Sequence, residues 1–145
     1  MIDITKKIME AMKSHDKVAS ETYKLVKAKI IEFKTQKNAP EYNDEAEIKL
    51  LQKMSKERKD TAKFYSDNGR PDLAEKELAE AAVIDAMLPK IPTEDDVVRY
   101  IHEHYTTGID KKQMGSVIKE VKSALLGVDG TIVANIVKMN LVWNL

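Results

Sequence analysis

Residues 89–96 read Pro-Lys-Ile-Pro-Thr-Glu-Asp-Asp, and this stretch divides the chain into two parts. Its two prolines lack a backbone N–H and hold φ near −65°, so a helix that arrives here ends and a stiff connection follows. Thr93 is a favourable helix N-cap, because its hydroxyl can accept a backbone N–H and the three acids after it complement the helix dipole. We therefore predict an N-terminal helical domain over 1–89 and a second domain over 93–145.

Four amphipathic helices are predicted before this boundary. Apolar residues recur there at three- and four-residue spacing, the period of one helix face. The segments concerned are 4–12, 18–37, 44–65 and 73–88. Asn68-Gly69-Arg70-Pro71 separates the last two, since glycine suits the residue after a helix and proline suits the first turn of the next. Asp44, with Glu47 three residues later, has the spacing of a capping box.

Three shorter helices are predicted after the boundary. Their apolar faces are Val97, Val98, Tyr100 and Ile101, then Met114, Val117, Ile118, Val121 and Leu125, then Ile132, Val133, Ile136, Val137 and Met139. Gly108 ends the first helix, Asp110 can cap the second, and the turn 127–130 leads into a last helix over 131–141. No segment alternates apolar and polar residues for long enough to predict a β-sheet. The predicted fold class is all-α, with about four helices followed by three.

The composition excludes several classes of protein. The 145 residues are 43% hydrophobic, with 24 basic and 24 acidic side chains, so the chain is not disordered by composition. The absence of cysteine removes disulfides, thiolate zinc sites and cysteine nucleophiles. No apolar run reaches the roughly 18 residues of a membrane span, and residues 1–7 lead into a charged stretch rather than the apolar core of a secretory signal. We expect a cytoplasmic protein without a membrane partner.

The neutral total hides an uneven distribution of charge. Residues 1–37 carry nine lysines and five acids, residues 41–92 nine basic and twelve acidic side chains, and residues 93–145 six and seven. A segregated layout of this kind can orient a polyanion on the basic regions. The other interpretation is that alternating charges only solvate the exposed faces of helices.

The residues offer little catalytic or metal-binding chemistry. His102 and His104 lie two positions apart, about 200° around a helix, so they cannot readily share a metal ion and are interpreted as solvent-facing. Clusters of Asp and Glu stand where helix caps and solvation explain them, and no nucleophile elbow, phosphate-binding loop or dinucleotide motif occurs. We therefore predict no catalytic residue, no metal and no cofactor. Trp143 is expected to anchor the last helix, or else to contact a partner.

Met114-Gly115 and Asp129-Gly130 are predicted to have a structural role. A glycine inside a helix costs about 1 kcal/mol relative to alanine, so Gly115 indicates a close approach between helices. Together the two dipeptides predict a compact helical hairpin.

A series of short motifs runs along residues 3–141. They are Asp16-Lys17, Val26-Lys27-Ala28-Lys29 with Glu32, Lys56-Glu57-Arg58-Lys59-Asp60 with Phe64 and Tyr65, Glu77-Leu78, Leu88-Pro89, Glu94, Met114-Gly115-x-Val117-Ile118, Asp129-Gly130, Val133 and Ile136-Val137. Their order and spacing resemble the YqeY family, whose C-terminal part is similar to the tail domain of the GatB subunit of glutamyl/aspartyl-tRNA amidotransferases. The chain departs from the family at 125–128, where Leu-Leu-Gly-Val replaces a basic Lys-Gly-Lys/Arg-like run.

The resemblance implies an all-helical fold whose three-helix C-terminal domain resembles a tRNA-contacting tail. Family labels name a carbon–nitrogen ligase with glutamine as amide donor, but the residues contain no catalytic set, so we expect no activity from the isolated chain. The candidate RNA-binding residues are Lys111, Lys112, Lys119, Lys122 and Lys138. The expected partners are tRNA or a tRNA-amidotransferase or synthetase complex. The alternative is a helical adapter that binds a protein through its N-terminal domain and binds no RNA.

Overall fold

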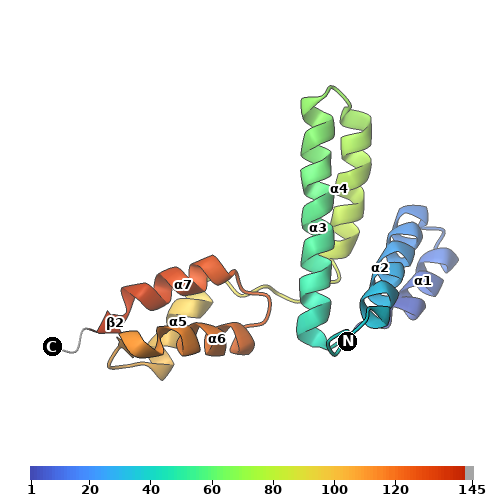
Figure 1. Ribbon diagram of the computed structural model, residues 1–145. Coiled ribbons are helices and arrows are strands. Elements are labelled where there is room, and N and C mark those ends of the chain that lie inside the picture. Colours follow the sequence, from blue (N-terminus) through green and yellow to red (C-terminus); the bar gives the residue numbers. More distant parts are fainter. Residues whose placement is uncertain (143–145) are drawn as a thin grey trace. The chain divides into compact units, whose positions relative to one another are not determined.

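The structure is a computed structural model that describes residues 1–142, so Trp143 lies outside the described residues. The chain forms two compact units, Met1–Pro89 and Lys90–Leu145. Seven α-helices make up most of the described chain, together with one 3-10 turn and one pair of two-residue strands (Figure 1). The predicted all-α class is confirmed. No helix within residues 1–142 is long and apolar enough to cross a membrane.

The first unit consists of two helical hairpins (Figure 1). Its helices are α1 (Ile4–Lys13), α2 (Lys17–Thr35), α3 (Asp44–Asp67) and α4 (Pro71–Asp85), with α1 packed on α2 and α3 on α4. The turn between α3 and α4 follows the predicted signals, because Gly69 has a φ of +73° and Pro71 is the first residue of α4. The core that joins the hairpins comprises Val26, Ile30, Leu51, Met54, Ile84 and Met87.

The start of α3 differs from the predicted capping box. Asn43, not Asp44, is the N-cap, and its side-chain oxygen accepts a backbone N–H of the first turn at 2.9 Å. The Glu47 carboxylate is buried instead, and it accepts hydrogen bonds from the Ile2 backbone N–H at 3.1 Å and from the Tyr42 hydroxyl at 3.0 Å. Glu47 therefore ties the N-terminal segment and the α2–α3 connection to the start of α3.

Three polar contacts hold α3 against α4. Arg58 Nε donates to Glu80 Oε2 at 3.2 Å, and each side chain is only 15% exposed. Ser55 Oγ donates to Asp85 Oδ1 at 2.5 Å, while Lys59 Nζ lies 2.9 Å from Asp85 Oδ2. Because these pairs lie at different heights along the hairpin, they set the register of the two helices.

The second unit contains α5 (Glu94–His104), a 3-10 turn η1 (Lys111–Gln113), α6 (Met114–Ala124) and α7 (Gly130–Met139). The predicted cap of α5 is confirmed, because Thr93 and Asp96 form a reciprocal capping box. Two short strands, β1 (Ile109–Asp110) and β2 (Leu141–Val142), pair in parallel. The core comprises Val97, Ile101, Ile109, Val117, Val121, Val133, Ile136 and Val137.

Two of the predicted helices are shorter than expected. The last helix ends at Met139 rather than 141, because Leu141 begins β2 and pairs with Ile109. The first helix of this unit ends at His104, four residues before Gly108. The period of apolar residues did not reveal either strand, since two residues are too few to show an alternation.

The close approach predicted at Gly115 is wrong. A β carbon on Gly115 would meet no other group within 4 Å, because this residue lies on the exposed side of the first turn of α6. Gly108 occupies the crowded position instead. It has a φ of +93°, and a β carbon there would overlap the Val142 side chain and lie 3.2 Å from the Asn140 carbonyl oxygen.

Candidate nucleic-acid interface

The sequence-predicted lysines all lie on one helical hairpin of the second unit. α6 buries Val117 and Val121 against the core, and α7 returns alongside α6 in the opposite direction (Figure 1). The β1–β2 ladder pairs Ile109 with Leu141, so the residues just before α6 lie beside the residues just after α7. The ladder thus closes the open end of the hairpin and holds both helices as one surface.

The lysine side chains project from the outside of this hairpin, and all five are exposed. Lys119 and Lys122 are three residues apart on α6, which places them on the same side of the helix. Lys122 reaches over the start of α7, since its Nζ lies 3.5 Å from the position that a β carbon on Gly130 would occupy. Lys112 precedes α6 in η1, and Lys138 lies in the last turn of α7.

The carboxylates of this hairpin are engaged at other positions. The Glu120 carboxylate accepts a hydrogen bond from the Tyr105 hydroxyl at the end of α5. Asp110 accepts the Lys112 backbone N–H at 2.9 Å, and Asp129 accepts the Thr131 backbone N–H at 2.8 Å. By contrast, the side chains of Lys112, Lys119, Lys122 and Lys138 form no ion pair with any residue of the described chain.

The charges of this unit are separated between helices. Residues 111–139 contain five lysines and two acids, whereas the first turn of α5 contains Glu94, Asp95 and Asp96. Because an anion is attracted to the first region and repelled by the second, a polyanion would approach this unit from the α6–α7 side.

The two histidines of α5 are exposed, as the sequence indicated. The His104 ring stacks on the Tyr100 ring at a centroid distance of 3.9 Å, and its Nδ1 lies 2.9 Å from the Tyr100 carbonyl oxygen. Within residues 1–142, no cluster of three histidine, aspartate or glutamate side chains is arranged to hold a metal ion.

The sequence model of the YqeY family, described as Yqey-like protein, matches residues 2–141. The chain belongs to the YqeY family. No curated protein matches the chain at a significant level.

The family motifs of this YqeY-like protein have structural roles in the hairpin. Met114 packs against the core at the start of α6, Asp129 caps α7, and Gly130 lies beside Lys122. The apolar residues Leu125 and Val128 of the α6–α7 turn also pack against this core. The turn therefore uses its side chains for packing, and the cations of the YqeY-like protein lie on the helices instead.

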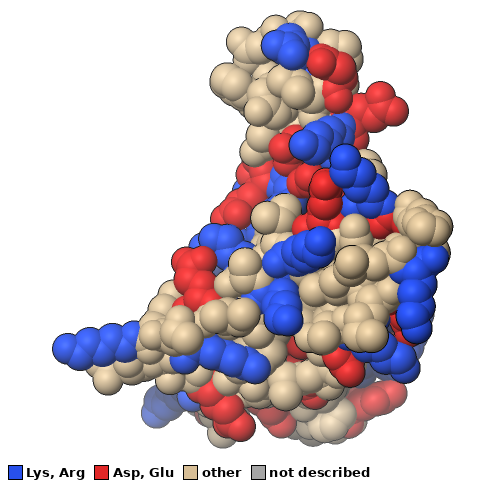
Figure 2. Space-filling view, turned by 90° about the vertical axis from the view of Figure 1, so that its right-hand side faces the viewer, with Lys and Arg blue, Asp and Glu red and all other residues tan. Residues whose placement is uncertain are grey.

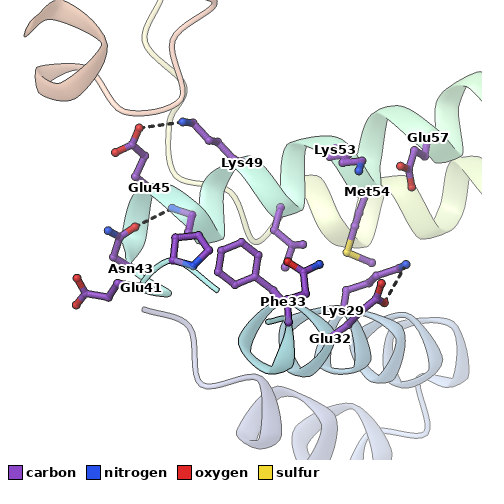
Figure 3. A pocket seen from close by; sticks show the side chains of 14 residues that line it. Lys29, Glu32, Phe33, Glu41, Asn43, Glu45, Lys49, Lys53, Met54 and Glu57 are labelled. Atoms are coloured by element: carbon purple, nitrogen blue, oxygen red, sulfur yellow. Dashed lines mark hydrogen bonds and ion pairs between the residues drawn. The ribbon is translucent and has the colours of Figure 1, made fainter. Parts of the chain in front are cut away.

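A groove lies between α2 and α3 in the first unit (Figure 3). The groove has a volume of about 520 Å³, and its apolar floor is formed by Phe33, Leu50 and Met54. Its rims carry two ion pairs, Lys29–Glu32 at 3.3 Å and Glu45–Lys49 at 3.0 Å. Sequence reasoning missed this groove because its walls come from two helices that are connected through residues 36–43.

Proposed function

We propose that this YqeY-like protein is a non-catalytic, tRNA amidotransferase-related module that binds structured RNA, with tRNA as the first candidate. The observation that carries the proposal is the set of exposed lysines on the α6–α7 hairpin. Lys112, Lys119, Lys122 and Lys138 are not neutralised by described carboxylates, so their charges are available to phosphates. Phosphate contacts of this kind position a protein on RNA without reading its sequence.

Because the whole chain has no net charge, attraction of RNA depends on the local group of lysines on the α6–α7 hairpin. A protein that neutralises Z phosphates loses affinity with salt at a logarithmic slope of roughly −0.7Z to −0.9Z. Four lysine contacts therefore predict a slope of about −3. A larger slope would require cations outside the hairpin.

Catalysis is not part of the proposal for the isolated chain. A glutamine-dependent carbon–nitrogen ligase needs an activated nucleophile and a nucleotide site, and the sequence contains no cysteine and no phosphate-binding glycine loop. On this proposal the protein delivers or holds RNA for a complete enzyme. Incubation of the purified protein with mischarged tRNA and glutamine should yield no amidated product.

Titration of fluorescently labelled tRNA at several salt concentrations tests the proposal. Substitution of Lys112, Lys119, Lys122 and Lys138 by Ala should weaken binding at least tenfold and make the salt slope smaller by about three. A control with Lys49, Lys53, Lys56 and Lys63 changed to Ala removes the same charge from α3. If the wild-type protein shows no affinity at low salt, the RNA proposal is wrong.

The groove between α2 and α3 favours a second candidate, the protein-interaction adapter. Its apolar floor and charged rims are suited to the apolar face of an amphipathic helix. A photo-crosslinker at Lys53, on the α3 rim, should then capture a protein in cells. Leu50→Asp on the groove floor should abolish that capture while leaving tRNA affinity unchanged.

A further inference from the structure

The first unit has a basic surface that the proposed RNA contact does not use. α2 carries Lys17, Lys24, Lys27 and Lys34 at intervals of seven, three and seven residues. At about 100° per residue, these four side chains fall within an arc of roughly 100° on the helix surface. The two acids of α2, Glu21 and Glu32, fall outside this arc. We call this arc, together with Lys6, Lys7 and Lys13 of the adjoining α1, the α1–α2 basic face.

The fold leaves these charges uncompensated. Of the nine lysines in residues 1–37, only Lys29 forms an ion pair with a described residue. In the hairpin of α3 and α4 the situation is reversed, because five of the eight basic side chains in residues 44–85 are paired. They are Lys49, Lys56, Arg58, Lys59 and Arg70. Figure 2 views the first unit from the α1–α2 side and shows blue side chains predominating there, while blue and red are mixed higher on the α3–α4 hairpin.

Two of the cations are held in place by aromatic rings. Lys7 Nζ lies 5.8 Å from the centroid of the Tyr23 ring, and Lys34 Nζ lies 5.0 Å from that of Tyr42. Such contacts orient an ammonium group without neutralising its charge. The basic face is therefore partly pre-arranged for an anionic partner.

The shape of the face favours a nucleic-acid backbone over a lipid surface. Val26 and Ile30 of α2 are buried in the core of the unit, whereas Val18 and Leu25 are 45% and 44% exposed and are separated from the lysine arc by Glu21. Ile31 is the one large apolar residue within the lysine arc, and it is 51% exposed. A helix that lies in a membrane surface needs a wide exposed apolar face beside its lysines. The 18 residues from Lys17 to Lys34 instead extend over about 25 Å, which is long enough to follow several phosphates.

We propose that the α1–α2 basic face is a second binding surface for the phosphate backbone of RNA. The proposal rests on the proposed function in that RNA is the ligand, but it assigns a contact to the other unit. Residues 89–92 connect the two units through a short segment with prolines at both ends. Two weak RNA contacts joined in this way bind more tightly than either alone, because the second contact forms at a high effective concentration.

The test uses the full chain and three sets of substitutions. The first changes Lys6, Lys17, Lys24 and Lys27 of the basic face to Gln, which removes charge but keeps helix propensity. The matched control changes Lys49, Lys53, Lys56 and Lys63 of α3 to Gln, with the same loss of charge in the same unit. The third is the α6–α7 set described above. The RNA probes are tRNA and a 20-base-pair RNA duplex, titrated at several salt concentrations.

The basic-face variant is expected to bind both RNAs at least tenfold more weakly than wild type, with a salt slope smaller by about three. The α3 control should remain within twofold. Loss in the basic-face variant with full binding by the α6–α7 variant would support this inference and overturn the assignment of the RNA contact to the α6–α7 hairpin. Loss of binding only in the α6–α7 variant would overturn this inference. Equal losses in the basic-face and α3 control variants would also overturn it, because the loss would then follow the net charge of the protein and not the position of the lysines.

A replacement variant and a lipid-binding measurement complete the test. If the fourfold variant lacks the wild-type helical circular dichroism, the single reversal Lys24→Glu replaces it, with Lys53→Glu as control. Binding to vesicles of phosphatidylserine and phosphatidylcholine is measured to test whether the face binds lipid. If wild type binds these vesicles but not RNA, and Lys24→Glu abolishes vesicle binding, the face is a membrane-binding surface and the inference is overturned.

Discussion

Gly108 and Val142 lie in contact across the β1–β2 ladder, so closely that a β carbon on Gly108 would overlap the Val142 side chain. The backbone of Gly108 also has a φ of +93°, which strains any other residue. We therefore expect Gly108→Ala to destabilise the second unit by roughly 2 kcal/mol. Thermal unfolding followed by circular dichroism, with hydrogen exchange of α5–α7, measures the effect.

Gly115 provides the matched control for this substitution. A β carbon there would meet nothing within 4 Å, and its φ is not in the positive range. Gly115→Ala should leave the stability of the unit unchanged or raise it by up to about 1 kcal/mol, because alanine is the better helix former. Equal losses at both positions would contradict the different roles assigned to the two glycines.

The Arg58–Glu80 ion pair should contribute to the stability of the first unit. Both side chains are 15% exposed, so removal of one partner leaves the other charge poorly solvated. Glu80→Ala should lower the free energy of unfolding in urea by about 2 to 4 kcal/mol. Asp60→Ala, which breaks the exposed pair with Lys56, should leave the urea midpoint unchanged. Similar effects of the two substitutions would refute the role of burial.

Asp85 should make the first unit sensitive to acid. Burial alone would raise the pKa of Asp85, but the Ser55 hydroxyl and the Lys59 ammonium outweigh burial and hold this pKa below its usual value of 3.8. A lowered carboxyl pKa stabilises the fold above the unfolded-state value of about 3.9 and loses that effect as the pH falls through the folded value. Urea midpoints of the wild type should therefore decrease below about pH 4, and those of Asp85→Asn should decrease less. Parallel curves for the two proteins would rule out this contribution.

The contact between Tyr105 and Glu120 should make the second unit sensitive to alkali. The hydrogen bond to Glu120, followed by burial and by the carboxylate charge, raises the pKa of Tyr105 to about 12. Because an unfolded tyrosine titrates near 10, the stabilisation is complete below about pH 10 and is lost between about pH 10 and 12. Ultraviolet titration of tyrosinate should show a late-ionising group that Tyr105→Phe removes.

Glu120→Gln should bring that ionisation back toward 10. It should also lower the pKa of Tyr100, which burial and then Glu120 raise. If the tyrosine titration of Glu120→Gln coincides with that of the wild type, the hydrogen bond does not set these values.

Features that depend on neighbours three or four residues apart could be predicted from the sequence. The Thr93 N-cap, the Gly69 turn and the proline at the start of α4 all lie where the residues indicated. The lysines of α6 and α7 could also be placed on exposed sides, since the apolar residues between them point to the core. Each of these features depends on the geometry of a single helix or turn.

Features that depend on distant segments needed the tertiary structure. Glu47 has the spacing of a cap residue, yet its partner Ile2 lies 45 residues away. In the sequence, Gly108 has the position of an ordinary helix terminator. Glycine is required there because Val142 of β2 packs against it and leaves no room for a side chain. Spacing along the chain cannot reveal such pairs, because packing brings them together.

The sequence by itself determined the seven helices, most of their ends and the charge of each segment, because helix period, caps and composition are local properties. Only the tertiary structure decided which charges pair between helices, as Arg58 does with Glu80. Lys59 of α3 reaches Asp85 of α4, whereas Lys24 of α2 forms no ion pair with a described residue. The physical reason is that compensation of a charge depends on which helix packs beside it.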